Sequence, residues 1–138
     1  MTFQEFKYYV GETVMFCQII ESDLKIIYVN LINGNKQETW TLIQKETLGS
    51  MVKMLQNLDS DNRLLSKNDY HYLHQLVGKR NHWCHQTFVN FLYNGQDFLN
   101  SKQYIEECNL LAQDHEQLSK IYRILEGIRV DLVRANRK

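Results

Sequence analysis

The stretch "TFQEFKYYVGETVMFCQIIESDLKIIYVNL", residues 2–31, decides the fold class. Thr2 and Glu5 have the spacing of a capping box, in which the two side chains satisfy backbone amides at the start of a helix. Behind this box, apolar side chains recur at steps of three, four or seven, which predicts one apolar stripe along a helix of about thirty residues. The stripe consists of Phe3, Phe6, Val10, Cys17, Ile20, Leu24, Ile27 and Leu31.

Three polar stretches divide the rest of the chain and are typical of loops. They are "NGN" at 33–35, "DSDN" at 59–62 and "NGQ" at 94–96. Side chains that favour helix starts follow the breaks, namely Thr47, Ser66 or Asn68, and Ser101. No strand-like alternation competes with this pattern, and the absence of proline favours long uninterrupted helices. The sequence therefore predicts a single all-α domain over residues 1–138, an antiparallel bundle of four to five helices, two of them long.

The composition limits the kinds of partner and compartment. Acidic and basic residues balance at 16 each, so no global field attracts an anionic partner, and any nucleic-acid site must be a local basic patch. The N-terminus lacks the apolar core of a signal peptide, and no apolar run approaches the length that crosses a bilayer. The three cysteines are far apart and form no C-x-x-C pair. These features predict a cytoplasmic protein with reduced cysteines and no membrane partner.

The segment "GKRNHWCHQTF", residues 78–88, concentrates the side chains that can do chemistry. When residues 70–92 are placed on one continuous helix at about 100° per residue, Arg80 falls inside an apolar sector. That sector consists of Leu73, Val77, Cys84, Phe88 and Phe91. An arginine in such a position is costly unless it has partners. We therefore expect a helix interruption near Gly78, a subunit interface at Arg80, or a carboxylate that pairs with its guanidinium.

Four histidines lie on roughly the opposite side of the same helix and raise the question of a metal site. They are His71, His74, His82 and His85, with Asn81 at their edge. One ion cannot bind both ends of the stripe, because His71 and His85 are about 21 Å apart along the helix. No paired Glu-x-x-His pattern supplies further ligands. Solvated surface histidines are the commoner explanation, so we expect no metal and no cofactor, and a metal-binding bundle is the third alternative.

Arg80, Asn81 and His85 together suit phosphodiester chemistry. An arginine fork can clamp a phosphate and stabilise its transition state, and a histidine can transfer protons near neutral pH. Asn81 and His85 are four residues apart, so they share a helix face and can form a hydrogen bond. RNA cleavage by attack of the 2′-hydroxyl needs stabilisation of the phosphorus transition state and proton transfer. A chain that supplies both needs no metal.

The motif "KRNHWCH" resembles the arginine–polar–x–x–x–histidine signature of the HEPN superfamily (higher eukaryotes and prokaryotes nucleotide-binding). The stretches "VGETVMFCQIIESDLKIIY", "ETLGSMVKML" and "HQTFVNFLY" also look HEPN-like, so the resemblance in layout covers nearly the whole chain, although only the signature is specific. It implies an HEPN-like helical domain that forms a homodimer, with a composite site where the two signatures meet. It also implies a metal-independent endoribonuclease acting as a toxin or in phage defence, with Arg80 and His85 catalytic and Asn81 supporting them.

Some residues near the signature modify this expectation. Lys79, His82 and Tyr72 are weaker candidates for contacts with the RNA substrate. Thr87 stands where one branch of the superfamily has a tyrosine that its nucleotidyltransferase antitoxin modifies, which argues against that mode of neutralisation. The sequence does not decide whether a cognate antitoxin of another kind, or another protein partner, binds the chain. Because some members of the superfamily lack nuclease activity, the alternative function is an inert helical module that binds a protein partner or a nucleotide.

Overall fold

The computed structural model describes residues 1–60 and 63–137; residues 61–62, which end the expected loop "DSDN", and residue 138 lie outside the described residues. All regular elements in the described ranges are helical, which confirms the all-α class. The α-helices are α1 (Phe3–Leu31), α2 (Lys36–Ile43), α3 (Leu48–Leu58), α4 (Lys67–Asn81), α5 (Val89–Leu92) and α6 (Lys102–Ala135). A π-helical turn (His82–Gln86) joins α4 to α5, and a 3-10 turn (Phe98–Asn100) precedes α6. No helix in the described ranges is long and apolar enough to span a membrane.

The helices begin where the local sequence predicts. Thr2 and Glu5 form the expected capping box at the start of α1. The side chains of Thr47, Ser66 and Ser101 cap α3, α4 and α6 by accepting a hydrogen bond from the backbone amide three residues later. These caps satisfy amides that have no partner inside the helix, so the starts follow from nearby residues alone.

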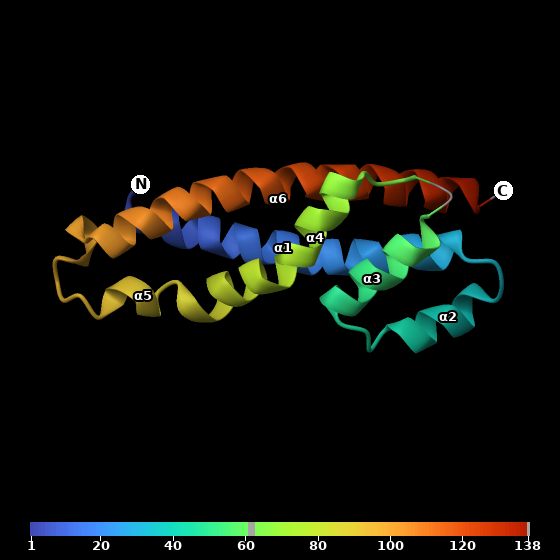
Figure 1. Cartoon of the computed structure of the whole chain (residues 1–138), viewed down its shortest axis with the longest axis horizontal. Coiled ribbons are helices and arrows are strands. Elements are labelled where there is room, and N and C mark those ends of the chain that lie inside the picture. Colours follow the sequence, from blue (N-terminus) through green and yellow to red (C-terminus); the bar gives the residue numbers. More distant parts are fainter. Residues whose placement is uncertain (61–62, 138) are drawn as a thin grey trace.

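The two long helices lie side by side and run in the same direction (Figure 1). Near their starts, the Tyr104 hydroxyl donates to the backbone carbonyl of Met1 at 3.3 Å. Near their ends, the Asn136 amide donates to the backbone carbonyl of Asn30 at 3.1 Å. The expected antiparallel arrangement is therefore wrong for this pair, and the described residues form six α-helices where four to five were expected. The segment from α4 to α5 returns the chain to the end of the molecule from which α6 starts (Figure 1).

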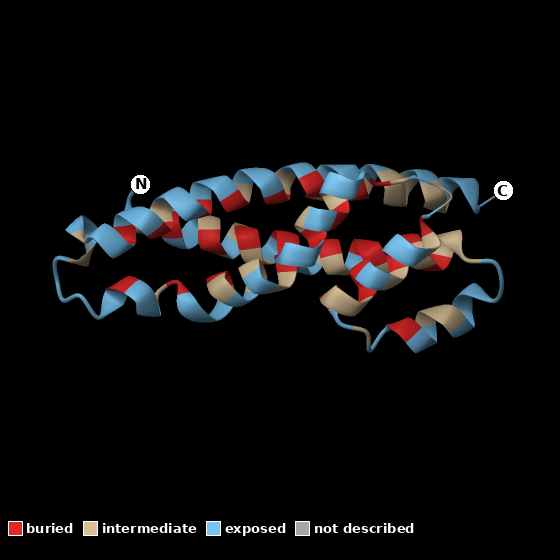
Figure 2. Ribbon diagram, viewed as in Figure 1, coloured by how far each residue is buried: buried red, intermediate tan, exposed pale blue. Residues whose placement is uncertain are grey.

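The buried side chains form two clusters along the α1–α6 pair, and Figure 2 shows the buried faces turned toward the interior. The aliphatic cluster, at the end that carries α3 and the start of α4, is built around Leu24, Leu48, Met51, Leu55, Leu73, Leu76, Leu118 and Leu125. The aromatic cluster, at the end that carries α5, consists of Phe6, Val10, Trp83, Phe91, Tyr104 and Leu111. Helix α4 runs from the aliphatic cluster toward the aromatic cluster, and the candidate signature, residues 80–85, lies where α4 ends.

The helix expected over residues 70–92 is interrupted by the π-helical turn. The Thr87 amide donates to the carbonyl of His82, five residues back, at 2.9 Å. This wider turn changes the face that the following residues present, and Trp83, Thr87 and Phe91 are buried. Cys84, expected in the apolar sector, is exposed instead. Single π-helical turns within α-helices occur frequently at functional sites.

Candidate functional site

Two buried carboxylates of α6, Glu107 and Asp114, hold the signature segment against the long helices. They are 7% and 3% exposed. Asp114 receives the Lys79 ammonium on Oδ1 at 2.7 Å and the Trp83 indole N–H on Oδ2 at 2.9 Å. A buried carboxylate is tolerated only when its oxygens are satisfied, and both oxygens of Asp114 are. The contact therefore fixes the last turn of α4 and the start of the π-helical turn to α6.

Glu107 fixes the other side of the π-helical turn. Its Oε2 contacts His82 Nε2 at 2.7 Å and accepts from the Thr87 hydroxyl at 3.0 Å. Its Oε1 accepts from the Asn90 amide at 2.8 Å. Hydrogen bonds have a preferred direction, so these contacts set the rotation of the segment as well as its position. The π-helical turn is thus held at both ends.

Sequence reasoning missed both carboxylates, although a signal was present. Tyr104, Leu111 and Leu118 recur at steps of seven along α6, and all three are buried. Glu107 and Asp114 stand between them at the same step, at positions where an apolar seam would have apolar residues. Acidic residues at such positions indicate buried partners elsewhere in the chain.

Arg80 is half-buried in the last turn of α4 and pairs with Glu21 of α1. Its Nη1 lies 3.6 Å from Glu21 Oε2. The α-helix continues through Gly78, so of the expected explanations for Arg80 the structure contains the carboxylate partner and not an interruption at that glycine. Strong charge-assisted hydrogen bonds are about 2.7–2.9 Å long. The longer contact with Glu21 leaves the guanidinium with donors available for a ligand.

His85 and Asn81 are both exposed. Within residues 1–60 and 63–137, neither side chain takes part in a hydrogen bond or an ion pair, and the expected bond between them is absent. The same part of the chain contains no interaction between Arg80 and His85. One chain therefore presents the guanidinium in the last turn of α4 and the imidazole within the π-helical turn that follows, without joining them.

The three weaker candidates are engaged inside the protein. Lys79 and His82 contact the buried carboxylates of α6, and the Lys79 ammonium also lies 5.6 Å from the centre of the Tyr72 ring. Tyr72 is half-buried, and burial raises the pKa of its hydroxyl above the ordinary value. The structure thus places Lys79 and His82 as anchors of the segment, with Tyr72 packed beneath Lys79.

The histidine stripe does not converge. His71 lies 3.2 Å from the Gln75 amide, and His74 lies 2.6 Å from the Gln56 carboxamide oxygen. His82 contacts Glu107, as described above. Across the described ranges, no three His, Cys, Asp or Glu side chains are grouped so that they could hold a metal ion.

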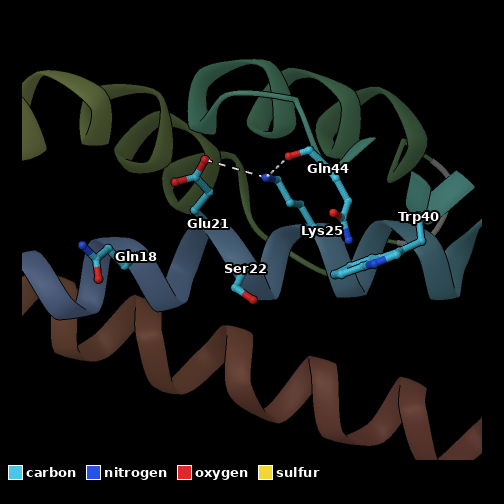
Figure 3. Close-up of a pocket in the computed structure, with 6 residues that line it drawn as sticks. All are labelled: Gln18, Glu21, Ser22, Lys25, Trp40 and Gln44. Atoms are coloured by element: carbon cyan, nitrogen blue, oxygen red, sulfur yellow. Dashed lines mark hydrogen bonds and ion pairs between the residues drawn. The ribbon is translucent and has the colours of Figure 1, made fainter. Parts of the chain in front are cut away.

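A hollow of about 350 Å³ lies next to Glu21, the carboxylate that pairs with Arg80 (Figure 3). It is lined by Gln18, Glu21, Ser22, Lys25, Trp40 and Gln44. Each α1 member has another member three or four residues away, so the four share one face of the helix. Comparisons of the chain with protein-family models, with curated proteins and with solved structures found no match.

Proposed function

We propose that the chain is a metal-independent endoribonuclease of toxin or phage-defence type, with an HEPN-like site formed by a homodimer. The observation that carries the proposal is the π-helical turn, which follows Arg80 and contains His85. Glu107 and Asp114 hold this turn on α6, while His85 stays exposed and Arg80 half-exposed. Catalytic groups work best when their support is already rigid, because no reorganisation is then needed during the reaction.

The roles follow from the chemistry of each side chain. The His85 imidazole accepts the proton of the RNA 2′-hydroxyl, whose oxygen attacks the adjacent phosphorus. The Arg80 guanidinium stabilises the charge on the pentacoordinate phosphorus. The bond to the 5′-oxygen breaks, the protonated imidazole returns a proton to that oxygen, and a 2′,3′-cyclic phosphate is left. Asn81 orients the imidazole or the phosphate.

A second copy of the chain completes this site in the proposal. No interaction joins Arg80 to His85 in the described part of one chain, so two signatures that face each other would supply the missing contacts. Val89, Leu92 and Tyr93 follow His85 and are exposed, with Tyr93 at 86%. Apolar side chains gathered on a surface favour a protein interface. A reducing, cytoplasmic setting fits the three free cysteines, and a cognate antitoxin would cover the same surface.

The test is RNA cleavage by purified protein in the presence of a chelator. Wild type is expected to leave 2′,3′-cyclic phosphate ends, and Arg80→Ala and His85→Ala are each expected to lower the rate by about 100-fold or more. His74→Ala is the matched control, because His74 is an exposed histidine of α4 whose partner is Gln56. A His85→Ala protein that cuts as fast as wild type would overturn the assignment.

The second candidate is an inert module of the same shape that binds a protein partner or a nucleotide. The Arg80–Glu21 ion pair favours it, because it gives Arg80 a structural partner in its own chain. Growth of cells after induced expression of wild type or Arg80→Ala distinguishes the endoribonuclease from the inert module. An endoribonuclease slows growth and alters the cellular RNA profile, and Arg80→Ala abolishes both effects, whereas an inert module gives the same growth and the same profile for both proteins.

A further inference from the structure

The hollow lined by Glu21, the partner of Arg80, has the size and the polar groups of a small-ligand site. Its volume, about 350 Å³, lies in the range of about 300–1,000 Å³ that small-molecule sites occupy. Figure 3 shows the Glu21 carboxylate, the Lys25 ammonium and Gln44 together on one side of α1, with Trp40 at one end and Gln18 at the other. Lys25 donates to the backbone carbonyl of Gln44 at 3.0 Å, which ties the end of α2 to α1.

The polar side chains of the hollow can form further hydrogen bonds with a ligand. Glu21 contacts Lys25 at 3.9 Å and Arg80 at 3.6 Å, both longer than a strong charge-assisted hydrogen bond. The Gln18 and Gln44 carboxamides take part in no hydrogen bond with other described residues. A carboxylate has about four acceptor positions, and an amide can both donate and accept. The hollow therefore offers a two-oxygen acceptor flanked by amides.

Trp40 supplies an aromatic surface at one end of the hollow. The indole is half-buried and packs against the aliphatic cluster, so its position is fixed while part of its surface faces the hollow. Bases of single-stranded RNA stack on such aromatic side chains, and their Watson–Crick edges are read by hydrogen bonds. An aromatic plane together with an open carboxylate suits a nucleobase better than it suits an aliphatic ligand.

We infer that this hollow binds a guanine base of the RNA strand, with Trp40 stacked on the ring and Glu21 reading its edge. Guanine alone among the four RNA bases presents two adjacent N–H donors, N1–H and N2–H, which match the two oxygens of a carboxylate. Adenine, cytosine and uracil each place an acceptor beside their donor, and a carboxylate repels that acceptor. A Gln18 or Gln44 amide then donates to guanine O6.

The inference rests on the proposed function, because Arg80 links the base to the reacting phosphate. Glu21 lines the hollow and contacts the Arg80 guanidinium, so a guanine bound to Glu21 would hold the RNA strand beside Arg80. The base in the hollow would then select which phosphodiester bond is cut.

Binding of mononucleotides tests the hollow without any cleavage. Calorimetric titration of the full chain is expected to show GMP binding at least 10-fold tighter than AMP, CMP or UMP. Glu21→Gln and Trp40→Leu are each expected to remove that preference, since one loses the matched acceptor and the other the stacking surface. Glu116→Gln is the matched control, because its carboxylate pairs with Lys120 on the exposed face of α6. Equal affinities for the four nucleotides, or a preference that survives Glu21→Gln in a folded protein, would overturn the inference.

Mapping of cleavage sites separates this inference from the proposed function. Wild type is expected to cut next to guanines, and the ratio of cuts at guanine to cuts at other bases is expected to fall at least 10-fold in Glu21→Gln. Cleavage without base preference that still needs Arg80 overturns the guanine site and leaves the endoribonuclease. If wild type cleaves no RNA, the endoribonuclease is overturned, and the GMP titration alone decides whether the hollow binds guanine.

Discussion

At the two ends of the molecule, different interactions attach the shorter helices to the α1–α6 pair. At one end, α3 and the start of α4 are held by the aliphatic cluster, whose members are almost all saturated side chains. At the other end, the π-helical turn and α5 are held by the aromatic cluster and by hydrogen bonds to Glu107 and Asp114. Apolar packing stabilises without a preferred direction, whereas hydrogen bonds define one. The end that carries the candidate site is therefore the end whose orientation is specified most closely.

The largest expected effect on stability lies in the aliphatic cluster. Leu24 is fully buried there, and Leu24→Ala removes apolar contacts and leaves a cavity. We expect the free energy of unfolding to fall by about 3 kcal/mol, measured by urea denaturation. Leu42→Ala is the matched control, since Leu42 is 75% exposed, and its effect should stay within about 0.5 kcal/mol. Equal losses for both variants would mean that this cluster is not the main source of stability.

A smaller effect on stability, with a larger one on function, is expected at the hydrogen-bonded end. Asp114→Ala leaves the buried Trp83 N–H without an acceptor, which should cost about 2 kcal/mol in unfolding free energy. The partly exposed Lys79 ammonium can turn to water, so it adds little to that cost. Because the turn loses one of its two anchors, RNA cleavage should fall more in Asp114→Ala than in Leu24→Ala at a temperature where both proteins are folded.

Glu116→Ala serves as the control for Asp114→Ala, because it removes an acidic side chain of α6 whose ion pair with Lys120 is exposed. Its stability and cleavage rate should match wild type. If Leu24→Ala instead impaired cleavage more than Asp114→Ala, the distinction between a stabilising end and an orienting end would fail.

The same distinction explains which features the sequence could predict. Helix starts at Thr2, Thr47 and Ser101 depend on a side chain and an amide three residues away, so local reading finds them. The parallel direction of α1 and α6 depends on contacts between residues more than a hundred positions apart, such as Met1 with Tyr104. No local pattern encodes such a pairing, and for this reason the antiparallel expectation was wrong for α1 and α6.

The candidate site was predictable in its residue types and not in its surroundings. Arg80 and His85 stand out in the sequence because of their chemistry, and their catalytic roles stay a prediction. The exposure of Cys84 was missed because a straight helix was assumed, and the π-helical turn depends on bonds from His82 and Thr87 to Glu107 on another helix. Burial and register in this segment are therefore decided by α6 and not by the segment itself.

The smallest expected effect concerns a third contact between the long helices, a half-exposed pair that belongs to neither cluster. Glu12 Oε1 of α1 lies 2.6 Å from His115 Nε2 of α6. The hydrogen bond with His115, followed by one with Tyr8, lowers the pKa of Glu12 below its ordinary value. The folded state thus binds this proton less readily than the unfolded state does, so the pair contributes stability above the ordinary carboxyl pKa, and this contribution is lost as pH falls through the lowered value.

In thermal melts, Glu12→Gln should lower the Tm at pH 6 and lower it less at pH 3. In a His115→Gln background, where the main cause of the shift is gone, most of that pH dependence should disappear, and an unchanged pH dependence there would show that another group sets the pKa of Glu12.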